Sequence, residues 1–298
     1  MSKPVIDIAI GLLLHHGKVL VGWREAKQHQ GNKYEFPGGK VESGESPEDA
    51  CRREIYEEVG IGIKQWYAFD RIQHEYEDII VCLHLFYAYV PDDLLTLIQQ
   101  PWTWYHRDQL MQLNFPKAND AILQRLFWSH FIKIGDKLSE FQLHTDSLFY
   151  WRVDEEQFQG DVLHTYSADD LTKLILNDEH YQQLSDDLKP LIKTLHLKQH
   201  QLMQFKKGDL ELGKRYIAAC HDLVALQHAE QIGCEAVFVS PIQPTQTHPH
   251  TKALGWTQLE EWSKQSQVLV FALGGLHPND LAQAQLHGAY GIAGIRNF

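Results

Sequence analysis

The first part of the chain alternates hydrophobic and polar residues over short segments, a pattern typical of β-strands with one buried face. Residues 5–21 alternate on both sides of His15-His16-Gly17-Lys18, so we expect a β-hairpin there. Aromatic and β-branched residues predict further strands at 67–72, 79–90 and 101–105. A helical period returns at 119–132. With the helix described below, these elements predict an α/β/α sandwich.

The second part of the chain has a different pattern, in which short apolar runs alternate with amphipathic helices. This pattern is typical of βα units and a parallel sheet. A linker with Gly135 and Asp136 at 133–139 separates two expected domains, 1–133 and 134–298. Seven or eight βα units would make a (β/α)8 (TIM-like) barrel, which we expect to be incomplete. The expected strands are 141–145, 174–177, 194–197, 216–220, 236–240, 268–273 and 291–295.

Residues 39–61, GKVESGESPEDACRREIYEEVGI, carry the strongest chemical signal. Ser46 is a good N-cap, and Gly60 suits the left-handed position that ends a helix. Spacings of three and four residues then place Glu54, Glu57 and Glu58 on one helical face, where like charges repel unless a cation lies between them. Mg²⁺ binds through a few carboxylates together with substrate phosphates. The segment therefore predicts a magnesium site and a phosphorylated substrate.

A plainer interpretation of this segment is a solvated helix whose acids pair with Arg52, Arg53 and Lys64. That interpretation leaves the preceding loop, Phe36-Pro37-Gly38-Gly39, unexplained. Gly38 and Gly39 allow the backbone to approach a ligand closely.

Composition narrows the choice of partners. The net charge of −12 argues against sequence-independent binding to DNA or RNA, but a free nucleotide that brings its own magnesium is compatible with it. No apolar run is long enough for a membrane helix, and we expect a cytoplasmic protein. The four cysteines contain no CxxC pair, so neither disulfides nor zinc are indicated by them. The group His248-Pro249-His250 is either a metal site or a solvated loop.

Residues 39–61 fill every fixed position of the Nudix box, and the first 130 or so residues resemble Nudix hydrolases of the MutT type, which remove oxidised guanine nucleotides. The likeness extends to residues 32–40 and 115–119. It implies that Glu54, Glu57 and Glu58 are catalytic and bind Mg²⁺, or Mn²⁺, together with the carbonyl of Gly38. Glu45 and Arg53 are better interpreted as a structural ion pair. The implied substrate contacts are Arg24, His29, Phe36, Lys40, Asp78 and Asn119.

The resemblance has two gaps, and one contact has two interpretations. A contact arginine of the MutT type aligns with Ile79. A further glutamate that binds metal or acts as a base aligns near Ile98, in a segment without carboxylates. Glu54 is then the best candidate to polarise the attacking water. Asn119 could read a purine edge with its amide, or it could simply be a helix N-cap.

Residues 140–298 resemble the thiamin phosphate synthase and thiazole tautomerase barrels. The likeness rests on Leu176-Asn177-Asp178, Leu195-His196-Leu197, the segments 219–222 and 240–249, and the glycines near the last two strands. Asp178 matches a magnesium-binding aspartate. Its partner is replaced by Gln201, a serine by Ala219 and a lysine by His248, and the first two βα units are shortened. These losses favour a barrel kept for packing or for a small phosphorylated ligand, while His221 occupies the tautomerase position or is a core histidine.

Three functions follow from these observations. The leading one is a magnesium-dependent hydrolase that converts 8-oxo-dGTP to the monophosphate and pyrophosphate, sanitises the nucleotide pool and so supports DNA repair. The second is a Nudix pyrophosphatase of thiamin metabolism. The third is a sensor whose barrel binds a thiamin-related phosphate. No direct binding to duplex DNA, RNA or membranes is expected.

Overall fold

The computed structural model describes residues 3–27, 31–143, 147–245, 252–295 and 298. The chain divides into two compact units, Met1–Trp128 and Ser129–Phe298. The boundary that we expected between residues 133 and 134 falls inside strand β8, Phe131–Gly135, which belongs to the second unit. The prediction placed the boundary too late because a short apolar run does not distinguish the end of a helix from a buried strand.

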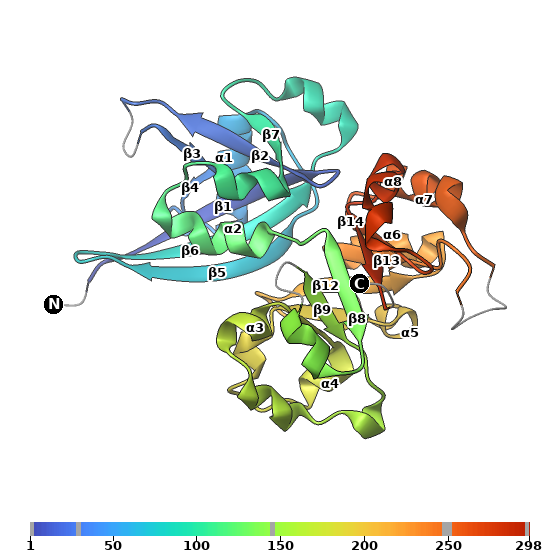
Figure 1. Cartoon of the computed structure of the whole chain (residues 1–298). Helices are drawn as coiled ribbons and strands as arrows, with labels where there is room; N and C mark the ends of the chain where they lie inside the picture. Colours follow the sequence, from blue (N-terminus) through green and yellow to red (C-terminus); the bar gives the residue numbers. More distant parts are fainter. Residues whose placement is uncertain (1–2, 28–30, 144–146, 246–251, 296–297) are drawn as a thin grey trace. The chain divides into compact units, whose positions relative to one another are not determined.

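The first unit is a mixed β-sheet with a helix on each face (Figure 1). Its strands run in the order β3-β2-β1-β6-β5, with β4 paired to β1 and β7 paired to β2. The strands are β1 Val5–His15, β2 Lys18–Arg24, β3 Lys33–Glu35, β4 Gly38–Lys40, β5 Tyr67–Glu75, β6 Ile80–Tyr89 and β7 Thr103–His106. The helices are α1 Pro47–Val59 and α2 Asp120–Leu126, with the 3₁₀ helices η1 Asp92–Leu97, η2 Arg107–Gln112 and η3 Lys117–Asn119. The predicted hairpin and sandwich are confirmed, whereas the helix expected at 119–132 ends at Leu126.

Strand β1 builds both hydrophobic cores because successive side chains of a strand point to opposite faces. Leu12 and Leu14 are buried in the cluster that includes Ile122 of α2. Leu13 is buried in the cluster that includes Ile55 of α1. The central strand therefore fixes α1, the helix with the acidic segment, against one face of the sheet.

The second unit is a closed barrel of parallel strands. Strand β15 pairs with β8, with Ile292 opposite Phe131, and this pairing closes the ring. The predicted barrel is confirmed, and the expectation that it is incomplete is wrong. The strands are β8, β9 Leu148–Trp151, β10 Leu174–Asn177, β11 Thr194–Leu197, β12 Arg215–Cys220, β13 Ala236–Val239, β14 Leu269–Leu273 and β15 Gly291–Gly294. The helices are α3 Ala168–Thr172, α4 Asp178–Gln182, α5 Gln199–Leu202, α6 Leu223–Ile232, α7 Gly255–Lys264 and α8 Leu281–Leu286.

The start of the barrel differs from the prediction. Residues 138–143, where we expected a strand to begin, form the 3₁₀ helix η4, and 144–146 lie outside the described residues. Strands β8 and β9 take the first two places in the barrel instead. Among the described residues, only η4 connects β8 to β9, which confirms that the first βα unit is shortened.

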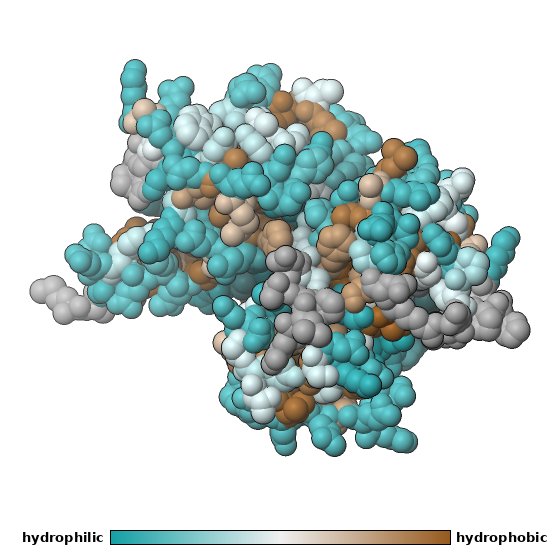
Figure 2. Space-filling model, in the orientation of Figure 1, coloured by the Kyte–Doolittle hydropathy of each residue, from teal (hydrophilic) through white to brown (hydrophobic). Residues whose placement is uncertain are grey.

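The face shown in Figure 2 carries mostly hydrophilic residues, with the hydrophobic residues in separate patches. Within the described ranges, no helix is both long and apolar enough to cross a membrane.

Candidate active site

Helix α1 begins and ends as its sequence predicts. The Ser46 hydroxyl accepts a hydrogen bond of 3.1 Å from the Asp49 N–H, and Gly60 has a φ of 80°. One face of α1 is buried and holds Cys51 and Ile55. The acidic residues lie on the part of the helix that this packing leaves accessible, so the core determines where the carboxylates point.

Arg53 connects helix α1 to the loop before it. Its Nε lies 3.0 Å from Glu45 Oε1, and its Nη2 donates to the carbonyl of Lys40 at 3.1 Å. Its Nη1 donates to Glu54 at 2.7 Å and lies 3.4 Å from Glu57. The Arg53 guanidinium is the main reason that the pKa of Glu45 is lowered. The predicted structural pair of Glu45 and Arg53 is confirmed, and Arg53 also orients Glu54.

The two glycines of the loop allow close packing on both sides. Gly38 has a φ of 147°, and a Cβ there would collide with the backbone carbonyl of Ala9. A Cβ on Gly39 would collide with the carboxylate of Glu54. The two glycines therefore let the loop pack against β1 on one side and against the acidic face of α1 on the other, and the expected close approach to a ligand remains a prediction.

Glu58 bonds to the Gly38-Gly39 loop and interacts with the neighbouring charged groups. Its Oε2 accepts a hydrogen bond of 2.9 Å from the Gly38 N–H. The pKa of this carboxyl is raised, mainly because burial removes its hydration and further because Glu54 and Glu35 are negatively charged. The hydrogen bond from the Gly38 N–H and the charge of Arg24 act in the opposite direction and lower the pKa. Carboxylates from α1 and β3 thus concentrate negative charge beside the Gly38-Gly39 loop, which is the environment that a hard divalent cation requires.

Glu35 is a member of this group that sequence reasoning missed, although it lies inside the segment 32–40 that carries the family likeness. Glu54, Glu57 and Glu58 are on the same helix as predicted, but they do not form a set with all ligand atoms within 4.8 Å of one another in the described part of the chain. Glu54 and Glu57 instead share Arg53 as a partner, and Glu58 accepts from the loop N–H of Gly38.

The structure places the implied substrate contacts as follows. Arg24 pairs with Glu35, with Nε 2.7 Å from Oε2. Phe36 is buried and stacks on Phe115, with ring centroids 4.9 Å apart, so it is part of the core. Lys40 is exposed at the end of β4, Asp78 is exposed between β5 and β6, and His29 lies outside the described residues. These contacts remain predictions.

Asn119 lies at the N-cap position of α2, but its side chain makes no capping hydrogen bond. Asn119 lies four residues after Phe115, and it is Phe115 that stacks on Phe36. The N-cap interpretation therefore does not account for this side chain. Near the missing family glutamate, Ile98 packs against the core together with Leu94 and Leu95. The segment that lacks a carboxylate thus has a packing role.

The barrel has a pocket of about 840 Å³ at the carboxyl ends of its strands. Arg152 and Lys198 line it, and no described residue of the lining is an aspartate or glutamate. His196 is buried in the wall, with its ring 4.5 Å from that of Tyr150. Burial first, and then the nearby charges of Lys198, Arg152 and His221, lower the pKa of His196 to about 3. The pocket is therefore positively charged and partly aromatic.

The partner of the expected magnesium aspartate, Asp178, is replaced by Gln201, and the amide of Gln201 is bonded to that of Asn177. The amides of Asn177 and Gln201 bond to each other at 2.9 and 3.1 Å, and both side chains are buried. Asp178 is absent from the described lining of the pocket. Burial is the main cause of the raised pKa of Asp178. One carboxylate outside the described lining, with a neutral amide in place of its partner, does not replace a pair of carboxylates as ligands of a hard cation, so this part of the barrel does not fit magnesium.

The interpretation of His221 as a core histidine is wrong, because its side chain is exposed, although it does bond to the backbone. It is exposed and lines the pocket, and its Nδ1 lies 3.1 Å from the carbonyl oxygen of Ser240. Because a carbonyl only accepts, this nitrogen carries the proton, and Nε2 keeps its lone pair when the ring is neutral. Gly274 and Gly275 also line the pocket, whereas His248 and His250 lie outside the described residues.

A Nudix sandwich with an acidic helix against a Gly-Gly loop defines the class of the first unit, and comparison with known proteins agrees. The model described as NUDIX domain matches residues 9–125. The 8-oxo-dGTP diphosphatase of Escherichia coli (strain K12) is 32% identical over 123 residues, which are 41% of this chain and 95% of that protein. The 8-oxo-dGTP diphosphatase of Proteus vulgaris is 39% identical over 87 residues, 29% of this chain and 78% of that protein. The chain belongs to the Nudix hydrolases.

The second unit has relatives of its own. The model described as thiamine monophosphate synthase matches residues 165–298. A putative thiamine-phosphate synthase 2 of Aquifex aeolicus (strain VF5) is 36% identical over 80 residues, 27% of this chain and 43% of that protein. The chain thus joins a Nudix hydrolase domain to a thiamine-phosphate synthase-like barrel.

Proposed function

We propose that the Nudix domain hydrolyses 8-oxo-dGTP and related nucleoside triphosphates to the monophosphate and pyrophosphate in the cytoplasm. The observation that carries this proposal is the position of the Glu54 and Glu58 carboxylates against the Gly38-Gly39 loop. Asn119 supports a guanine-type nucleotide as substrate, because its amide can donate to and accept from a purine edge at once and is not used as a helix cap. The same reaction would sanitise the nucleotide pool.

Glu54, Glu57, Glu58 and the carbonyl of Gly38 would hold Mg²⁺, or Mn²⁺ in its place. When bound, the ion neutralises charge on the phosphoryl oxygens and lowers the pKa of water. Glu54 is held between Arg53 and Gly39, where its carboxylate can orient the attacking water and take its proton. Glu58 must be ionised to act as a ligand, so its raised pKa makes activity fall on the acidic side.

A second candidate function is favoured by the barrel pocket. Arg152 and Lys198, without a described carboxylate in the lining, suit a small phosphorylated ligand that binds without magnesium. Such a ligand would make the chain a Nudix pyrophosphatase of thiamin metabolism or a sensor of a thiamin-related phosphate.

The experiment that separates these functions compares hydrolysis of 8-oxo-dGTP, dGTP, ADP-ribose and thiamin pyrophosphate by the purified chain with Mg²⁺. We expect the highest kcat/KM for 8-oxo-dGTP. Glu57→Gln should lower turnover at least about 100-fold, because it removes a charge that compensates the metal. Near-normal turnover of Glu57→Gln would exclude the metal site, and a preference for thiamin pyrophosphate would favour the second candidate.

A further inference from the structure

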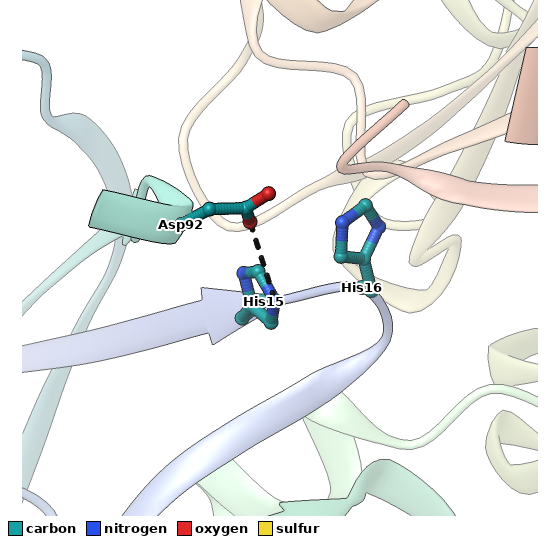
Figure 3. A group of neighbouring side chains, drawn as sticks. All are labelled: His15, His16 and Asp92. Atoms are coloured by element: carbon teal, nitrogen blue, oxygen red, sulfur yellow. Dashed lines mark ion pairs between the residues drawn. The ribbon is translucent and has the colours of Figure 1, made fainter. Parts of the chain in front are cut away.

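A group of three potential metal ligands lies outside the acidic helix. His15 ends β1, His16 begins the turn after it, and Asp92 begins η1 (Figure 3). One ligand atom from each residue lies within 4.8 Å of the other two, and no other such group of three exists among the described residues. We propose that these residues bind a divalent transition-metal ion of the zinc type.

His15 is oriented as a metal-binding histidine. Its Nδ1 lies 3.0 Å from the carbonyl oxygen of Val90, which can only accept, so this nitrogen carries the proton. In the neutral ring, Nε2 then keeps its lone pair. Val90 is itself fixed, because its N–H donates to the Leu14 carbonyl at 2.8 Å. A backbone carbonyl behind the ring is the usual support of a histidine that ligates a metal.

The spacing between His15 and Asp92 also fits an ion. Nε2 lies 3.7 Å from Asp92 Oδ1, which is too long for a hydrogen bond. Ligand atoms about 2.0 to 2.2 Å from a tetrahedral zinc ion are about 3.3 to 3.6 Å apart. The two atoms therefore need to move only slightly to share one ion. Figure 3 shows the Asp92 carboxylate directed toward His15.

The turn brings the second imidazole to the same place. His16 and Gly17 have φ values of 43° and 77°. In a continuing strand, neighbouring side chains would point to opposite faces. Here the left-handed turn leaves the rings of His15 and His16 with centroids 4.5 Å apart. Asparagine before glycine would suit such a turn well, so histidine is not required for the backbone conformation.

The donor set determines the kind of ion. Two imidazoles and one carboxylate suit zinc and its neighbours in the transition series, with water at the remaining position, whereas magnesium prefers oxygen ligands. The proposed site therefore takes a different ion from the carboxylates on α1. An ion held there would connect the β1–β2 turn to η1.

The test is a titration of the full chain, without an added histidine tag, with Zn²⁺ in competition with a chromophoric chelator. Excess Mg²⁺ is present to occupy the carboxylates of α1. We expect saturable binding to the wild type and a loss of affinity of at least about tenfold in Asp92→Asn and in His16→Asn. His15 is left unchanged because its bond to Val90 supports the fold.

Two features make the outcome decisive. His16→Asn creates an Asn-Gly turn, so its melting temperature without metal should equal or exceed that of the wild type even as zinc affinity falls. His164→Ala is the matched control, because His164 faces Asp187 at 3.6 Å but belongs to no group of three ligands in the described chain. It should bind zinc as the wild type does. Unchanged affinity in Asp92→Asn and His16→Asn, or no saturable binding by the wild type, would overturn the proposal.

Discussion

At the scale of single residues, Asn119 shows how one polar side chain separates two interpretations. Asparagine at the start of a helix is ordinarily a cap, but here the side chain makes no capping bond to α2. A partly buried amide without that structural role is suited to hydrogen bonding with a base.

We predict that Asn119→Ala reduces the preference for 8-oxo-dGTP over dGTP. An unpaired polar edge in a closed pocket costs about 1 to 3 kcal/mol, which is about 5- to 150-fold in kcat/KM. The melting temperature should stay within error of the wild type, since no cap is lost. Unchanged discrimination combined with a loss of about 1 kcal/mol in the free energy of unfolding would instead show that Asn119 is a cap.

At the scale of elements, the loop before α1 and the acidic face of α1 depend on each other. Gly38 packs its backbone against β1, and Gly39 leaves space for the carboxylate of Glu54. The two glycines have different neighbours, so the same substitution should have different effects at each.

Gly39→Ala should displace the Glu54 carboxylate, the flexible end of a side chain, and lower turnover at least about tenfold while the fold stays stable. Gly38→Ala meets the Ala9 backbone at a φ of 147° and should cost about 2 kcal/mol or more in the free energy of unfolding. Gly62→Ala has nothing within 4 Å and serves as the control for both. Chemical denaturation and steady-state kinetics measure the two effects, and equal behaviour of the Gly38 and Gly39 variants would contradict this account.

At the scale of the whole molecule, a closed barrel is retained although Gln201 replaces the partner of its one expected magnesium aspartate, Asp178. The mutual amide bonds of Asn177 and Gln201 satisfy both buried groups, so this arrangement is stable in itself. The positive lining around Arg152 and Lys198 remains open to an anion.

We predict that the full chain carrying Glu57→Gln makes no detectable thiamin phosphate, because transfer from a pyrophosphate requires metal held by two aspartates and Gln201 cannot supply the charge of the second. The assay combines the pyrimidine pyrophosphate and thiazole phosphate with Mg²⁺. Formation of thiamin phosphate would refute the loss of the magnesium site. Tautomerisation of the thiazole substrate that His221→Ala abolishes would show that the exposed imidazole is catalytic.

Much of the fold could be predicted from the sequence because its information is local. Strands β10 and β11 have the predicted bounds, since short apolar runs lie between polar segments. The caps at Ser46 and Gly60 determine where α1 begins and ends, and the positions of its acids on one face follow from the helical period. The family and the capped acidic helix could therefore be predicted from the sequence itself.

Other features were decided only by contacts between distant segments. Strand β8 was missed because Lys133 interrupts its apolar run; the burial of this lysine depends on the Ile295 carbonyl, 2.6 Å from its Nζ. Glu35 joins the acidic group, and Asp92 meets His15, only because the sheet brings these segments together. The sequence determined most of the elements and the acidic face of α1, because propensity, caps and period act over a few residues. The tertiary structure decided which charges meet and how the barrel closes, because those energies arise only after packing.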